Sequence, residues 1–118
     1  MTFFRYSKTT PTVNIAGTWS GYLTDDLPNT DRPDRYKLHP MLMRHLVVRS
    51  AKVDTTFNVT VYDYEDIPIR KFTTATQVVN DLTLTPIMGK TKITIDTVAV
   101  NNDEFTVLAV LQEGNGGD

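Results

Sequence analysis

The sequence predicts an all-β protein, a single antiparallel β-sandwich of the jelly-roll or immunoglobulin-like kind. Between Met41 and Gln112, apolar and polar residues alternate with a period of two, and threonine is abundant, as in half-buried strands. Apolar residues do not recur at helical spacing over three turns, which argues against a long helix. Short strands separated by turn residues are typical of a sandwich.

The chain has 118 residues, of which 40% are hydrophobic, so one core can be filled and a single domain over residues 1–118 is expected. The first and last segments are poor core material. We therefore expect an extended N-terminal arm over residues 1–12 and a flexible tail over residues 113–118. Residues 24–37 carry many charges and two prolines, and they predict a long charged loop.

The strands are expected in chain order as follows. Gly17 to Leu23 predicts a short strand between glycines. Met41 to Ser50 predicts a longer strand that begins after Pro40, with one helical turn as the alternative. In the next strand the alternate residues should point into the core; these are Phe57, Val59 and Val61.

Two further runs precede the C-terminus. The run that ends at Pro86 places Val78, Leu82 and Leu84 on one face. The run from Lys92 to Val100 and the run from Glu104 to Gln112 flank a turn signal at Asn101 to Asp103, and together they predict a hairpin. The inward residues of the last strand should be Phe105, Val107, Ala109 and Leu111.

The segment from Tyr62 to Pro68 places three acids between and after two tyrosines, at the point where two predicted strands meet. Such a group could serve as a carboxylate pair or as an aromatic platform for a sugar. Because no other residues supply the second half of either site, the turn rules favour a hairpin corner with an acidic tip.

Other possible sites are weaker. Asp25, Asp26, Asp31 and Asp34 do not have the spacing of a calcium loop, so we favour a solvated loop in which Arg32 and Arg35 pair with these acids or with a neighbouring chain. No catalytic partner is spaced near His39 or His45. We expect no cofactor, no metal and no enzymatic activity.

Charge and composition exclude several classes. The formal net charge of -2 gives no general attraction to nucleic acid. The chain has no cysteine, which excludes disulfides and thiolate chemistry. It also lacks the apolar runs of a signal peptide or a membrane span, so no membrane partner is expected.

The segment from Leu46 to Glu113 resembles small β-sandwich virion proteins of tailed bacteriophages, of the capsid decoration or cement type. The resemblance is carried by "LVVRSAKVDTTFNVTVYDYEDIPI" and by "LTPIMGKTKITIDTVAVNNDEFTVLAVLQE", which are strand and turn patterns and not site motifs. It covers a little over half of the chain, and residues 1–45 lie outside it.

This resemblance implies a non-enzymatic structural protein in the virion, which decorates or cements the capsid or the head-to-tail region. Its partners would be the major capsid protein or other virion proteins, and it would form a homo-oligomer of closed symmetry, often a trimer. The residues that we expect at the interface are Phe3, Phe4, Arg5, Tyr6, Arg32, Arg35, Tyr62 and Tyr64.

The alternative is a carbohydrate-binding or receptor-binding β-sandwich. It predicts that Trp19, Tyr22, Tyr62 and Tyr64 are exposed together as a flat stacking surface. The competing structural interpretation places Trp19, the single tryptophan, in the core.

Overall fold

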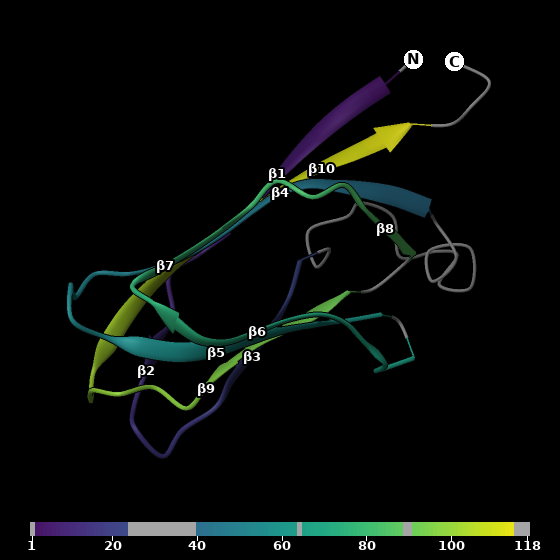
Figure 1. Cartoon of the computed structure of the whole chain (residues 1–118). Coiled ribbons are helices and arrows are strands. Elements are labelled where there is room, and N and C mark those ends of the chain that lie inside the picture. The colour runs from purple at the N-terminus through teal and green to yellow at the C-terminus, as the bar shows by residue number, and fades with distance from the viewer. Residues whose placement is uncertain (1, 24–39, 64, 89–90, 115–118) are drawn as a thin grey trace.

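The computed structural model describes residues 2–23, 40–63, 65–88 and 91–114. Every regular element of these residues is a β-strand, and the strands form two antiparallel sheets that pack face to face (Figure 1). The prediction of an all-β sandwich is confirmed. Within the same residues, no helix has the length and apolar character needed to cross a bilayer.

The first sheet, called the large sheet, has the strand order β1-β10-β4-β7. These strands are β1 (Thr2–Thr9), β10 (Asp103–Gly114), β4 (Pro40–Ser50) and β7 (Val78–Asp81). Two short strands extend its edges: β2 (Thr12–Val13) pairs with β10 beyond the end of β1, and β8 (Thr85–Met88) pairs with β4 beyond β7. The predicted strand from Met41 to Ser50 corresponds to β4.

The second sheet, called the small sheet, has the order β3-β9-β5-β6. Its strands are β3 (Trp19–Tyr22), β9 (Lys92–Asp96), β5 (Thr56–Tyr62) and β6 (Pro68–Thr76). The predicted hairpin with an acidic tip is present, because β5 and β6 are antiparallel neighbours on either side of that corner.

The N-terminal segment predicted as an arm is extended, but it pairs with its own chain. All 8 residues of β1 lie opposite β10 in an unbroken register, from Thr2 with Gly114 to Thr9 with Val107. The pair formed by β1 and the end of β10 runs away from the small sheet (Figure 1). The predicted tail begins inside β10, and residues 115–118 lie outside the described part of the chain.

The core lies between the two sheets and is made of alternate residues, as the period of two predicts. Phe57, Val59 and Val61 of β5 are fully buried, and so are the predicted inward residues of β10. The Phe57 and Phe105 rings meet edge to face, with centroids 4.8 Å apart, and so connect the sheets. Each such side chain stabilises the fold by about 1.5–3 kcal/mol through burial.

The predicted hairpin of the last two strands is wrong. β9 pairs with β3 and β5 in the small sheet, whereas β10 pairs with β1 and β4 in the large sheet. Thr97 has a φ of 53°, and Val98 takes the buried position after it. The turn at Asn101 and Asn102 is real, but it lies on a connection between the two sheets.

The face assigned to Val78, Leu82 and Leu84 is the solvent face. These side chains are exposed, and the buried residues of β7 are Val79 and Asp81. Asp81 can face inward because it pairs with Arg70 of the small sheet, and Gln77, with a φ of 59°, lies where the chain passes from β6 to β7.

Candidate interaction surfaces

Strand β1 presents aromatic side chains to solvent. Phe4 is 51% exposed and Tyr6 is 67% exposed, both on the face of the large sheet that points away from the core. The partners of these residues on β10 are Gln112 and Val110, which are only partly buried. Two large aromatic side chains on an edge strand are typical of a protein interface.

The backbone of β1 also has a free side. Among the described residues, β1 pairs with β10 alone. The Phe105 amide donates to the Pro11 carbonyl over 2.8 Å, so the odd-numbered residues of β10 direct their peptide groups toward β1 and β2. The register then assigns the odd residues of β1 to the ladder with β10. The N–H and C=O groups of Thr2, Phe4, Tyr6 and Lys8 therefore point to the open edge.

The rest of this outer face mixes apolar residues and cations. Val110 and Val47 are half-buried, whereas Lys8 and Arg49 are exposed. Arg44 is the extra residue of a bulge in β4, opposite Val110 and Leu111 of β10, and its guanidinium donates to the Gln112 Oε1 over 2.5 Å. His45 Nε2 lies 2.6 Å from the Asn80 side-chain oxygen, within hydrogen-bond distance.

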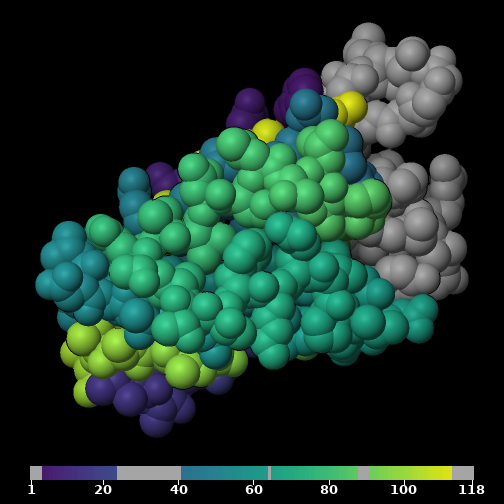
Figure 2. All heavy atoms as spheres, in the orientation of Figure 1, coloured from purple at the N-terminus to yellow at the C-terminus, as the bar shows by residue number. Residues whose placement is uncertain are grey.

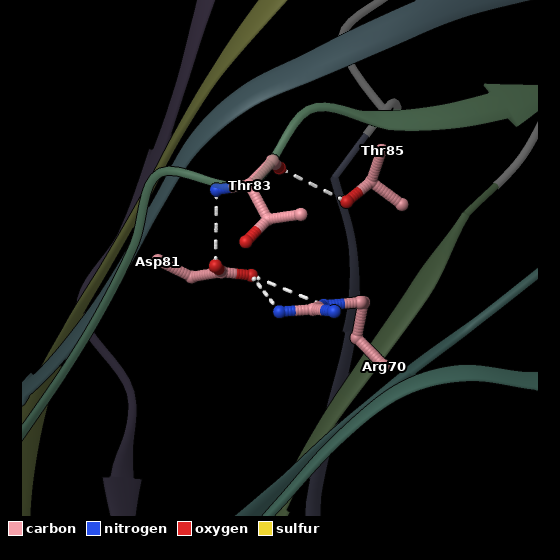
Figure 3. Close-up of polar contacts among 4 residues, drawn as sticks. All are labelled: Arg70, Asp81, Thr83 and Thr85. Atoms are coloured by element: carbon pink, nitrogen blue, oxygen red, sulfur yellow. Dashed lines mark hydrogen bonds and ion pairs between the residues drawn. The ribbon is translucent and has the colours of Figure 1, made fainter.

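The opposite edge of the large sheet is joined to the small sheet by an ion pair. Arg70 of β6 donates twice to the Asp81 Oδ2 atom, from Nε at 3.1 Å and from Nη2 at 2.8 Å (Figure 3). The other Asp81 oxygen accepts from the Thr83 amide at 3.1 Å. The atoms of β6 and of the segment β7 to β8 form one continuous surface on this side (Figure 2).

The environment of Asp81 changes its pKa. Burial by itself would raise the pKa, since it disfavours the charged form. The hydrogen bonds from Thr83, with the hydrogen bonds and the charge of Arg70, outweigh burial and hold the pKa of Asp81 below its ordinary value of 3.8. Asp81 is therefore an ionised structural acid near neutral pH. Sequence spacing gave no signal for this pair.

A second buried carboxylate holds the far end of the sandwich together. Asp103 is fully buried and accepts hydrogen bonds from the Ser50 and Thr55 hydroxyls, the latter over 2.8 Å. These three residues stand at the start of β10, the end of β4 and just before β5. The group connects strands of both sheets, so its role is structural.

The acidic corner after β5 is organised by a side chain. The Asp63 Oδ1 atom accepts from the amides of Glu65 and Ile67 at 2.8 and 2.9 Å. This pattern is an Asx-type turn, in which the carboxylate holds the loop. Asp66, with a φ of 62°, reaches the Lys92 ammonium at 3.3 Å.

Two of the aromatic residues proposed for a stacking surface lie in one row of the small sheet. Tyr22 of β3 and Tyr62 of β5 both pair with Lys92 of β9, so the three side chains share the outer face. The Lys92 ammonium is 4.7 Å from the centre of the Tyr62 ring. Trp19 is not part of this row, since it is partly buried and packs against the core. The structural interpretation of Trp19 is thus the better one.

The remaining predicted interface residues divide into two groups. Arg5 is half-buried on β1, on the face opposite to Phe4 and Tyr6. The side chain of Phe3, the residues Arg32, Arg35 and Tyr64, and the loop over residues 24–37 lie outside the described part of the structure. His39 and the four loop aspartates are outside it too. Over the described residues, no three His, Cys, Asp or Glu side chains gather as a metal site would require.

A shallow hollow of about 320 Å³ lies where β1 turns into β2. Threonine hydroxyls, Arg49 and Glu104 line it together with Phe105. Because one cation and one anion share this lining, the hollow carries no clear preference for a charged ligand.

Comparison with known proteins identifies no family. No protein-family model matches the chain, and no curated protein is similar to it. Among solved structures, the whole chain is similar to 34% of a chain in the structure of the infectious bursal disease virus Gt strain, with 9% identity and a TM-score of 0.36. The protein thus spans about a third of the length of that chain.

Proposed function

We propose that this chain is a non-enzymatic structural protein of a virion, and that it decorates or cements the capsid or the head-to-tail region of a tailed bacteriophage through contacts between subunits. The observation that supports this most strongly is the open edge of β1, which combines free main-chain groups with the exposed Phe4 and Tyr6. An extended strand of this kind suits a protein whose task is to bind other subunits.

The polar groups of the interior support a structural role as well. Asp81 and Asp103 are the buried carboxylates of the described chain, and both are held by partners that connect the two sheets. Each therefore has a structural role between the two sheets.

Sedimentation of candidate capsid particles with the purified protein tests the proposal. The expected result is binding that saturates at a fixed copy number per particle. The variant Phe4→Ala with Tyr6→Ala should weaken binding at least tenfold. The matched control, Leu82→Ala with Leu84→Ala, removes equally exposed side chains from the other edge and should bind as the wild type does. Failure of the wild type to sediment with any particle would contradict the proposal.

A carbohydrate-binding or receptor-binding role is the second candidate, and the row of Tyr22, Lys92 and Tyr62 favours it. Tyrosine rings on a flat sheet face can stack on sugar rings. A glycan array with the wild type and the Tyr62→Ala variant tests it. A glycan bound by the wild type and lost in the variant would support this function over the first.

A further inference from the structure

We propose that β1 pairs with the β1 strand of a second copy of this chain, antiparallel and across a two-fold axis at Tyr6, so that two large sheets become one continuous sheet. The inference rests on the proposed function in treating β1 as an assembly strand: the second copy would take up the main-chain groups of the open edge, and the outer face of the joined sheet would remain for contacts with capsid subunits. It also replaces the trimer that the family resemblance implies with a dimer.

The free main-chain edge of β1 is long and regular. Proteins usually protect an edge strand by making it short, by placing proline in it, by a bulge or by an inward charge. β1 has 8 residues, none of them proline, and its register with β10 has no irregularity; its two charges are Arg5, half-buried on the inner face, and Lys8 on the outer face. Every second residue from Thr2 to Lys8 directs its N–H and C=O to the open side. Such an edge is a template for another strand.

Two copies of β1 can pair only in certain registers. In two antiparallel copies, edge-facing residues of one strand pair with edge-facing residues of the other. The two-fold axis therefore lies midway between one residue and its own copy. An axis at Arg5 places Arg5 opposite its own copy, and like charges directly opposite are unfavourable. An axis at Tyr6 places Arg5 opposite Ser7 and keeps the pairing inside the strand from Phe3 to Thr9. Of these two axes, the charge of Arg5 favours the one at Tyr6.

In this register the side chains of the two β1 strands are complementary. Tyr6 meets Tyr6 of the second copy at the centre, which is a favourable aromatic cross-strand pair. Lys8 lies opposite Phe4 of the second copy on the same outer face, where an ammonium and an aromatic ring attract. One strand thus supplies both halves of each contact. This self-complementarity is the property of a two-fold interface, and it favours a second copy over an unrelated strand.

The chain contains no cysteine, so a single introduced thiol reports on this geometry. In the proposed dimer the two Cα atoms of residue 6 are about 5.5 Å apart, within the range of a disulfide. The two Cα atoms of residue 8 are roughly 14 Å apart, since four residues of strand separate them. Under mild oxidation, the Tyr6→Cys variant should form a cross-linked dimer. The Lys8→Cys variant, exposed on the same face, is the matched control and should stay monomeric on a non-reducing gel.

A mixture of the Phe4→Cys and Lys8→Cys variants should cross-link to each other, because these positions lie opposite in the proposed register. Light scattering of the wild type should give twice the monomer mass at high concentration and a decrease on dilution. A wild type that is monomeric at all concentrations would overturn the inference, and so would equal cross-linking at positions 6 and 8.

The outcome is separable from that of the proposed function. A wild type that binds particles but remains a monomer, without cross-linking at position 6, would mean that β1 pairs with a strand of another protein. In that case the inference fails and the proposed function stands. A dimer with the predicted cross-links that binds no particle would leave the inference standing and would contradict the proposed function.

Discussion

The two edges of the large sheet are built differently. At the β7 edge the strand has 4 residues, the continuing strand β8 contains Pro86, and Asp81 turns inward to bind Arg70 of the other sheet. At the β1 edge the strand has 8 residues, no proline and two exposed aromatic rings, and its charges are the half-buried Arg5 on the inner face and the exposed Lys8 on the outer face. One sheet therefore has a protected edge and an open edge.

The difference between the two edges supports the proposal that partners bind at the β1 edge. Short strands, proline and inward charges all prevent unwanted pairing with other chains. The β7 side has short strands, a proline and the inward Asp81, whereas β1 is long, has no proline and pairs with β10 without a bulge. The same sheet can thus disfavour pairing at one edge and still present the other edge for assembly.

The largest expected effect comes from opening the protected edge. The Arg70→Met change keeps the aliphatic stem but leaves the Asp81 carboxylate, whose side chain is 7% exposed, without its cation. We expect a loss of about 2–3 kcal/mol in the free energy of unfolding, less than for a fully buried pair because the Arg70 side chain is partly exposed. Urea denaturation measures it. Lys71→Met, on the exposed neighbour, should cost within about 0.5 kcal/mol; equal losses would refute the role of the ion pair.

A second test compares adjacent residues on the open edge. Ser7→Pro removes an N–H from the ladder with β10, and we expect a loss of about 1–3 kcal/mol. Tyr6→Pro removes an N–H that faces the open side, where proline is tolerated, so its cost should be below about 1 kcal/mol. Thermal and urea unfolding at low protein concentration, where the monomer prevails, make the comparison. A larger cost at position 6 than at position 7 would show that the deduced direction of the β1 peptide groups is wrong.

The pH dependence of stability reports on the protected edge alone. The pKa of Asp81 is lower in the folded chain than its ordinary value of 3.8, so folding is favoured while the carboxylate is ionised. This contribution is present above pH 3.8 and is lost as the pH falls through 3.8 toward the lower folded value. The stability difference between the wild type and Asp81→Asn should therefore shrink below about pH 4. Parallel curves down to pH 2 would contradict the assignment.

The smallest expected effect is a gain at the corner that leads into β7. Gln77 has a φ of 59°, which a residue with a Cβ adopts at a cost, and its peptide groups bond to Thr55 and Ser50. Gln77→Gly should raise stability by about 0.5–1 kcal/mol, whereas Gln77→Ala keeps the strain and should show no gain. Calorimetry of both variants distinguishes them; a gain from alanine as large as that from glycine would exclude backbone strain as the cause.

Alternation along single strands made much of the fold predictable. The inward residues of β5 and β10 follow from it because one face of each strand is buried. Alternation does not show whether β9 and β10 form a hairpin. The same turn residues at Asn101 fit a chain that returns to its own sheet and a chain that crosses to the other sheet. For β7 the buried Asp81 reversed the expected face, because its cation lies eleven positions earlier, on β6.

The candidate surface was only partly predictable. The adjacent residues Phe3 and Phe4 led us to expect an interacting segment, but they do not alternate with polar residues as in a half-buried strand. The strand β1 was therefore not predicted, because an edge strand that is exposed to solvent does not need strict alternation. The direction of its peptide groups depends on the register with β10, which lies about a hundred residues away in the sequence. The row of Tyr22 and Tyr62 likewise required β9 to lie between β3 and β5.

Assembly through the open edge of β1 is tested by amide hydrogen exchange along this strand, followed by NMR at increasing protein concentration. The amides of Arg5 and Ser7 should be protected at every concentration, because they bond to β10. The amides of Phe4, Tyr6 and Lys8 should exchange fast in dilute solution and become protected as the second copy binds. Fast exchange of these three amides at the highest concentration, with Arg5 and Ser7 still protected, would contradict assembly through the open edge.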